Sequence, residues 1–289
     1  MRILPLLVAS LTLALSPLLN AGEILVKTGE SIAFLGDSIT AQGAASSGGY
    51  VRLVASGLAA QGIEVTVVPA GISGHKSDQM LARLNNDVLS KKPTWMTLSC
   101  GVNDVWHGDK GVPLEAYKKN ITEILDRCQQ AGVKVVVLTA TQIKLPLTSP
   151  ENAKLAGYNA FLRNTAKTRN LPLADLNAAM AAEQAALEKA GIKRVLTGDG
   201  VHMNLYGNLM MAKGVLSAFG LDDQQLAAAN AKWSELPDLY RGAAKIELSL
   251  AEFTALEASA ARQKKTVDAF VSDLATAAVK ASLKPAPAK

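Results

Sequence analysis

The hydrophobic pattern of the chain alternates between two kinds of segment from residue 31 to residue 219. Apolar runs of strand length are separated by longer stretches in which apolar residues recur with the period of a helix. The runs do not alternate with polar residues, which is typical of parallel strands covered on both faces. We therefore predict a three-layer α/β/α fold around a five-stranded parallel sheet. The predicted strands are Ser31–Leu35, Val65–Val68, Thr94–Ser99, Lys134–Thr139 and Leu173–Asp175, and the predicted helices are Tyr50–Ala60, Ser77–Ser90, Leu114–Ala131, Asn152–Arg169, Ala178–Ala190 and Leu205–Phe219.

Polar residues and glycines follow three of these strands at the point where each strand ends. Ser38 follows the first strand, Gly74 the second and Asn103 the third. Right-handed crossovers bring the carboxyl ends of parallel strands to one edge of the sheet, and open sheets of this kind bind ligands at that edge. We expect these residues to meet there although they lie far apart in the sequence.

Three residues have the chemistry of a nucleophile, its base and the acid that orients the base. Ser38 is the candidate nucleophile, because a serine hydroxyl reacts when a neighbouring base takes its proton. Asp199 precedes His202 by three residues, so its carboxylate can accept from Nδ1–H and leave Nε2 for the serine. His75 and His107 lie in loops at the same edge, and His107 also follows an aspartate by three residues. Spacing alone therefore leaves the identity of the base open.

Two further residues could stabilise an oxyanion. The amide side chain of Asn103 and the backbone N–H of Gly74 are candidate donors, and one such donor changes a rate by roughly 100- to 1000-fold. The alternatives are an Asx turn for Asn103 and a plain turn glycine for Gly74. Asp104 is expected to hold its loop rather than to take part in chemistry.

The first 21 residues have the pattern of a secretion signal. A positive start at Met1 and Arg2 precedes an almost wholly apolar stretch from Ile3 to Leu19, and small residues around Ala21 offer a cleavage point. The alternative is a membrane anchor, for which the stretch is short and interrupted by prolines. We expect cleavage after Ala21 and a secreted or periplasmic mature chain.

The pattern changes after Leu221. An irregular connector is expected around Trp233, and the spacing of Ser249 and Glu252 is that of a capping box. One helix is predicted from Leu250 towards Val279, packed on the flank of the sheet domain or, alternatively, binding a partner. The last residues, 284–289, contain two prolines and are expected to be disordered.

Composition excludes several classes of function. The chain has 289 residues and a net charge of +5, without dense basic clusters, so no nucleic-acid partner is expected. No spacing typical of metal ligands or of phosphate-binding loops occurs, so no cofactor or metal is expected. Cys100 and Cys128 should lie near opposite edges of the sheet, because a long helix separates them, and we expect two free, buried thiols. The sequence leaves the oligomeric state open.

Four blocks of sequence, in this order, resemble those of the SGNH (GDSL-type) hydrolases, and the resemblance covers residues 30–219. It implies the flavodoxin-like fold of that family and an esterase activity. It also implies that Ser38 is the nucleophile, that Asp199 and His202 complete a triad, and that the N–H groups of Ser38 and Gly74 form the oxyanion hole with Asn103. The blocks are residues 32–38 (IAFLGDS), 71–74 (GISG), 101–104 (GVND) and 199–202 (DGVH).

The resemblance has one departure and defines the expected domains. The second block usually opens with asparagine, and here that position is Pro69, whose missing N–H could loosen the loop that carries Gly74. The expected organisation is a signal peptide over 1–21, an SGNH hydrolase domain over 22–221, and a C-terminal helical extension with a disordered tail over 222–289.

The loops near the expected site indicate a small substrate. The segments 42–49 and 106–112 are short and polar, with only Tyr50 and Trp106 as aromatic neighbours, and they offer no apolar lid for a fatty chain. We expect hydrolysis of short-acyl esters, O-acetyl groups on carbohydrates in particular, through an acyl-enzyme. The alternatives are a lysophospholipase or lipase-type esterase and a non-catalytic glycan-binding protein on the same fold. The expected partner is a small-molecule or carbohydrate ester, with no membrane span after signal cleavage.

Overall fold

The computed structural model describes residues 23–193, 195–237, 239 and 246–283. Its five strands form one parallel sheet in the order β2-β1-β3-β4-β5, which confirms the predicted α/β class. The chain moves outward from β1 to β2 and then crosses back to β3, so a crevice is expected beyond the carboxyl ends of β1 and β3. The strands are β1 (Ser31–Gly36), β2 (Thr66–Gly71), β3 (Trp95–Ser99), β4 (Lys134–Leu138) and β5 (Leu173–Ala174).

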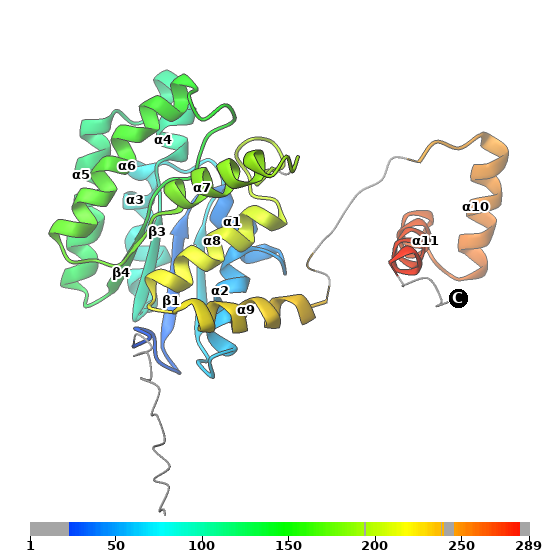
Figure 1. Ribbon diagram of the computed structural model, residues 1–289, viewed down its shortest axis with the longest axis horizontal. Helices are drawn as coiled ribbons and strands as arrows, with labels where there is room; N and C mark the ends of the chain where they lie inside the picture. Colours follow the sequence, from blue (N-terminus) through cyan, green and yellow to red (C-terminus); the bar gives the residue numbers. More distant parts are fainter. Residues whose placement is uncertain (1–22, 194, 238, 240–245, 284–289) are drawn as a thin grey trace, which may run out of the picture. The chain divides into compact units, whose positions relative to one another are not determined.

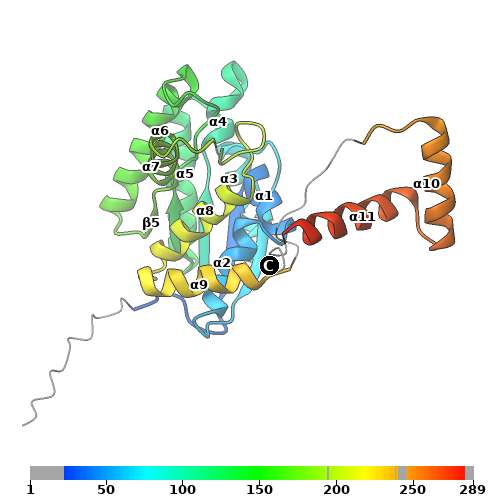
Figure 2. The same ribbon diagram turned by 45° about the vertical axis from the view of Figure 1, so that its right-hand side comes forward.

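Helices cover both faces of this sheet (Figure 1). On one face α3 and α6 both contact α5, and on the other α8 and α9 both contact α2. The view in Figure 2 shows α8 and α9 lying across α2. The helices of this part are α1 (Ser38–Ala45), α2 (Tyr50–Ala59), α3 (Ser77–Asp87), α4 (Val102–Trp106), α5 (Leu114–Gln130), α6 (Pro150–Thr168), α7 (Leu176–Lys189), α8 (Leu205–Ala218) and α9 (Asp223–Glu235), with 3₁₀ turns at Leu89–Lys91 and Gly108–Lys110.

The central strands are buried on both faces, which explains their unbroken apolar runs. β1 is buried from Ile32 onward, and every residue of β3 is buried. The ring of Phe34 meets that of Tyr50 from α2 edge-on, with centroids 6.1 Å apart. Trp95 meets Phe219 in the same way at 5.4 Å. Aromatic pairs of this geometry add to the free energy gained from burial alone.

The strand β2 is longer than its apolar run predicted. Pairing with β1 continues through Pro69, opposite Phe34, to Gly71, opposite Gly36. Because β2 lies at the edge of the sheet, a residue without an N–H is tolerated there. The loop beyond it is held by the N–H of Ile72, which donates to the carbonyl of Gly36 at 3.1 Å. This bond ties the start of the loop to the end of β1.

The structure divides the chain between Tyr240 and Arg241 rather than at Leu221. The segment in which an irregular connector was expected begins with α9, whose side chain Trp233 is 1% exposed. Its indole Nε1–H donates to the carbonyl of Leu53 in α2 at 3.0 Å. A capping box formed by Asp222 and Gln225 starts this helix, and α9 belongs to the core of the first unit because its apolar face packs on α2.

The second unit contains two helices where the sequence predicted one. The capping box of Ser249 and Glu252 starts α10 (Leu250–Arg262), as expected. The helix then stops, because Lys264 adopts a left-handed conformation with φ of 55°. Thr266 caps a new helix, α11 (Val267–Ser282), by accepting from the N–H of Ala269. The predicted continuous helix over 250–279 is therefore wrong at this break.

Three further expectations concern the ends of the chain and the cysteines. The proposed signal peptide and the tail over 284–289 lie outside the described residues. Within the described part of the chain, none of the helices combines the length and the apolar character that crossing a bilayer requires. Cys100 and Cys128 are both free and buried, as predicted.

Candidate active site

Ser38 lies at the carboxyl end of β1, where the chain turns directly into α1. Asp37 caps the helix by accepting from the N–H of Ile39 at 2.9 Å, and Ser38 is the first helical residue. A side chain at Gly36 would collide with that of Thr40, so this sharp turn requires glycine there. The turn therefore fixes Ser38 at the sheet edge with its N–H in the first turn of a helix, where no intrahelical acceptor exists.

Asp199 and His202 come from one tight turn before α8. One carboxylate oxygen of Asp199 accepts from the backbone N–H groups of Val201 and His202 at 2.9 and 2.7 Å, and the other lies 2.6 Å from His202 Nδ1. The hydrogen bond from His202 is the main reason why the pKa of Asp199 is lowered to about 2. Gly200, with φ of +92°, allows the turn. The carboxylate thus stays ionised and fixes the plane of the imidazole.

The imidazole of His202 joins this turn to the end of β1. His202 Nε2 lies 2.8 Å from the hydroxyl oxygen of Ser38. With Nδ1–H donating to Asp199, Nε2 carries the lone pair and the Ser38 hydroxyl donates to it. The structure therefore brings together the three residues singled out as nucleophile, base and orienting acid.

The other two histidines do not make this contact. His75 Nδ1 accepts from Arg83 Nε at 3.1 Å, and burial together with this guanidinium lowers the pKa of His75. His107 lies at the rim of the same cleft and is exposed. The hydroxyl of Ser38 is bonded to His202 instead, so of the three histidines His202 is the one that the structure places on the serine.

Both candidate oxyanion donors line the same cleft as Ser38, which has a volume of about 400 Å³. Gly74 adopts a φ of +77°, which a residue with a side chain rarely takes. The amide of Asn103, from α4, donates to the carbonyl of His75 at 3.1 Å and to Asp37 at 3.4 Å. The residues lining the cleft are Ser38, Gln42, Ser73, Gly74, Asn103, Trp106, His107, Asp199, Val201 and His202.

This geometry agrees with the comparison with known proteins. A sequence profile of the GDSL-like Lipase/Acylhydrolase family matches residues 34–209. The chain belongs to this family. An acetylxylan esterase from Geobacillus stearothermophilus is 27% identical over 216 residues, which are 68% of this chain and 97% of that protein. Esterase TesA from Pseudomonas aeruginosa is 33% identical over 110 residues, 38% of this chain and 53% of its own.

Solved structures of acetylxylan esterases have the same fold. The crystal structure of the acetyl xylan esterase AlAXEase is 31% identical, covers 65% of this chain and 98% of its own, and gives a TM-score of 0.59. Axe2, an acetylxylan esterase from Geobacillus stearothermophilus, is 26% identical with a TM-score of 0.61, covering 68% of this chain and 97% of its own. The chain is therefore a carboxylic ester hydrolase of the SGNH type that acts on acyl esters.

Two buried carboxyl groups, those of Asp37 and Asp104, lie near the cleft but are not among the residues that line it. Burial raises the pKa of Asp37 to about 6, and burial also raises the pKa of Asp104. Asp104 accepts from the N–H and the hydroxyl of Ser77 at 3.0 and 2.5 Å, and the thiol of Cys100 lies 3.6 Å away. Asp104 thus ties α4 to the start of α3, the loop-holding role that was expected.

The aromatic residues expected near the site differ in their exposure. Tyr50 is fully buried and its hydroxyl is bonded to Thr40, so it does not line the cleft. Trp106 lies in the cleft wall and is 37% exposed, with the ammonium of Lys144 4.5 Å from the centre of its ring. A lysine at this distance makes a cation–π contact. One partly exposed indole, that of Trp106, thus lines the same cleft as Ser38 and His202.

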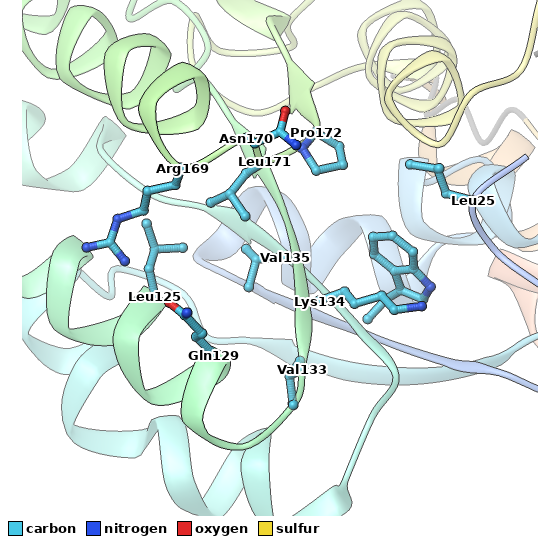
Figure 3. A pocket seen from close by; sticks show the side chains of 12 residues that line it. Leu25, Leu125, Gln129, Val133, Lys134, Val135, Arg169, Asn170, Leu171 and Pro172 are labelled. Atoms are coloured by element: carbon cyan, nitrogen blue, oxygen red, sulfur yellow. The ribbon is translucent and has the colours of Figure 1, made fainter.

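A larger hollow of about 620 Å³ lies at the other edge of the sheet (Figure 3). Its wall includes Trp95 and Lys134, the first residues of β3 and β4, together with Leu125, Arg169 and Leu171. The serine, the histidine and the aspartate described above lie at the carboxyl edge instead. The smaller cleft is therefore the candidate active site.

Proposed function

We propose that the chain is a secreted serine esterase that removes short acyl groups, O-acetyl groups on carbohydrates in particular, through an acyl-enzyme. The observation that carries this proposal is the hydrogen-bonded series from Asp199 through His202 to Ser38, with distances of 2.6 and 2.8 Å. A base in this position can take the serine proton as the hydroxyl attacks.

In the proposed reaction Ser38 Oγ attacks the ester carbonyl carbon and its proton passes to His202 Nε2. The tetrahedral intermediate collapses as His202 returns that proton to the departing alcohol oxygen. Water then attacks the acyl group on Ser38, giving its proton to His202, and the free acid leaves as the proton returns to the serine. Asp199 keeps the imidazole in the tautomer that both steps require.

The oxyanion of this intermediate would accept from the N–H groups of Ser38 and Gly74 and from the amide of Asn103. The Ser38 N–H is the first of helix α1 and has no intrahelical acceptor. The amide of Asn103 donates to His75 at 3.1 Å and more weakly to Asp37 at 3.4 Å. The longer bond is the one that we expect to be exchanged for a bond to the oxyanion.

Two observations favour a short acyl group on a carbohydrate. The cleft holds about 400 Å³ and its wall is mostly small or polar, with one exposed indole, that of Trp106. An acetyl group fits a wall of this kind, and an indole face is a suitable surface for a sugar ring. The acetylxylan esterases to which the chain is similar over most of their length support the same substrate class, and catalytic mutants of one of them replace a serine or an aspartate.

Secretion is the second part of the proposal. The pattern of residues 1–21 supports export with cleavage after Ala21. Carbohydrate polymers are extracellular substrates, so an exported enzyme would meet them. Expression of the full chain in a bacterium, followed by amino-terminal sequencing of the exported protein, should give a first residue Gly22. Intact protein retained in the membrane would contradict export.

The substrate is tested by release of acetate from a panel of acetylated glycans and by rates on p-nitrophenyl acetate, octanoate and palmitate. We expect the acetate ester and acetylated xylan fragments to be preferred. A preference for palmitate would favour the lipase-type alternative instead.

The nucleophile is tested on the same substrates with Ser38→Ala. We expect a loss of at least about 1000-fold. Ser90→Ala is the matched control, because Ser90 is exposed in the 3₁₀ turn after α3 and its hydroxyl donates to the carbonyl of Asn86 at the end of that helix. Equal rates of Ser38→Ala and the wild type would overturn the proposed mechanism.

A further inference from the structure

Arg83 is a partly buried arginine of α3 whose side chain is 10% exposed. Its guanidinium makes four hydrogen bonds at the carboxyl edge of the sheet. Nη2 donates to the carbonyl of Gly36 and Nη1 to that of Ala70, each at 2.8 Å. Nε donates to His75 Nδ1 at 3.1 Å, and Nη1 also donates to Asp87 at 2.8 Å.

Three of the four acceptors of this guanidinium precede or hold a candidate oxyanion donor. Gly36 lies at the end of β1, two residues before Ser38, and Ala70 lies near the end of β2, before the loop that carries Gly74. His75 accepts from the amide of Asn103 through its backbone carbonyl at 3.1 Å. One planar group therefore bonds the segments that supply two of the donors, and also His75, which holds the third donor.

The remaining contact of Arg83 supplies a countercharge. Asp87 lies one turn further along α3 and forms an ion pair with the guanidinium. A buried cation without a partner is costly. The pair with Asp87 balances the charge, while the other three hydrogen bonds of the guanidinium go to neutral acceptors. Arginine suits this role because its fork of donors is planar and rigid, which the single ammonium of lysine does not reproduce.

We propose that Arg83 is a positioning residue that fixes the N–H groups of Ser38 and Gly74 and the amide of Asn103 in the geometry of an oxyanion hole. This inference rests on the proposed function of the site. Donors of this kind stabilise a transition state only when they are held in place before the reaction, and small displacements of such groups are costly to the rate. Arg83 is not one of the residues that line the cleft, so it would act through the backbone segments that it holds.

The test replaces Arg83 by Lys, which keeps the charge but loses the fork, and by Ala, which loses both. We expect kcat on p-nitrophenyl acetate to fall roughly 10- to 100-fold in both variants, with KM changed by about twofold or less. The affinity for a boronic acid that forms a tetrahedral adduct with Ser38 should fall by the same factor as kcat/KM. Arg127→Ala is the matched control, because Arg127 forms an exposed ion pair one helical turn from Glu123.

Chemical rescue separates positioning from general support of the fold. Methylguanidinium added to Arg83→Ala should restore part of kcat, whereas methylammonium should not. The inference is overturned if kcat of both variants stays within about twofold of the wild type. It is also overturned if Arg83→Lys, folded by circular dichroism, loses affinity for the ester and for the boronic acid equally.

The outcomes for Arg83 and for the proposed function remain distinguishable. An inactive Ser38→Ala together with fully active Arg83 variants would overturn the positioning role alone. A fully active Ser38→Ala would overturn the proposed mechanism, whatever the Arg83 variants do.

Discussion

The carboxylate of Asp199 holds His202 through both of its oxygens. One accepts from the backbone N–H of His202 at 2.7 Å, and the other lies 2.6 Å from ring Nδ1. The short turn therefore fixes the orientation of the His202 ring in the absence of substrate. The turn provides the orientation that a distant acid provides in other hydrolases.

Asp199→Asn should lower kcat by at least about 100-fold. The amide can keep the backbone bond, but its NH₂ cannot accept from Nδ1–H, so the ring is driven to the tautomer with its hydrogen on Nε2. The measurement is kcat on p-nitrophenyl acetate. Asp126→Asn is the control, because Asp126 pairs with Arg169, which lines the hollow at the opposite edge of the sheet. Wild-type turnover of Asp199→Asn would show that the orientation of the base does not depend on this carboxylate.

Gly74→Ala should lower kcat roughly 10-fold or more, because a left-handed φ is strained for alanine and relaxation of the turn would move the N–H proposed as a donor. Space is not the cause, since nothing lies within 4 Å of the added Cβ. Gly62→Ala is a matched control with φ of +75° and the same open space, in a turn remote from the site. Both variants should lose similar stability in thermal unfolding. Equal kcat for the two would contradict a role of Gly74 in the reaction.

The sheet could be predicted from the sequence because parallel strands that are buried on both faces consist of uninterrupted runs of apolar residues. The prediction was wrong at the end of the second strand. We ended that strand before Pro69, although an edge strand tolerates proline and β2 continues through it. The segment with Trp233 and Pro237 suggested a connector, although the capping box of Asp222 and Gln225 was present to indicate α9. The second C-terminal helix begins at the cap Thr266. The break before it was missed because the apolar residues on either side fit one continuous helical stripe.

Some residues of the site could be predicted from their positions at strand ends, and others are identified only by tertiary packing. Ser38 and Asn103 follow strands directly, so topology alone predicts that they share an edge. Arg83 gave no such signal, because an arginine on an amphipathic helix is ordinarily a solvated residue. Its partners are backbone carbonyls of distant strands, and only the packing of α3 against the sheet makes them neighbours.

The stability of the wild type relative to Asp37→Asn should fall as the pH rises. Burial raises the pKa of Asp37 from 3.8 to about 6, so the folded state binds this proton more tightly than the unfolded chain. The stabilisation is complete below about pH 4 and is lost as the pH passes about 6. Over this window the difference in unfolding free energy should change by roughly 3 kcal/mol.

Asparagine is the matched substitution because it keeps the acceptor for the N–H of Ile39 and has no titrating proton. Urea unfolding of both proteins from about pH 4 to pH 8 measures the difference. A difference that is independent of pH, or that grows in favour of the wild type as the pH rises, would show that burial does not disfavour the ionised form of Asp37.

The indole of Trp233 is buried in the core of the first unit. It is 1% exposed, and a side chain on Gly57 would come within 3.3 Å of its ring. A chain ending at Leu221 lacks α9 and exposes the part of α2 that this helix covers. Its free energy of unfolding should fall by at least about 3 kcal/mol, the cost of losing a buried tryptophan, relative to a chain ending at Leu239, which keeps the helix.

Trp233→Phe in the full chain tests the same contact with a smaller change. Phenylalanine keeps part of the buried area but cannot donate to the carbonyl of Leu53, which the indole reaches at 3.0 Å. The loss of one buried hydrogen bond costs about 0.5–1.5 kcal/mol, so this variant should unfold between the wild type and the chain ending at Leu221 when followed by circular dichroism. If the chains ending at Leu221 and Leu239 melt together, α9 contributes nothing to the core, and the division of the chain after Leu221 would be the correct one.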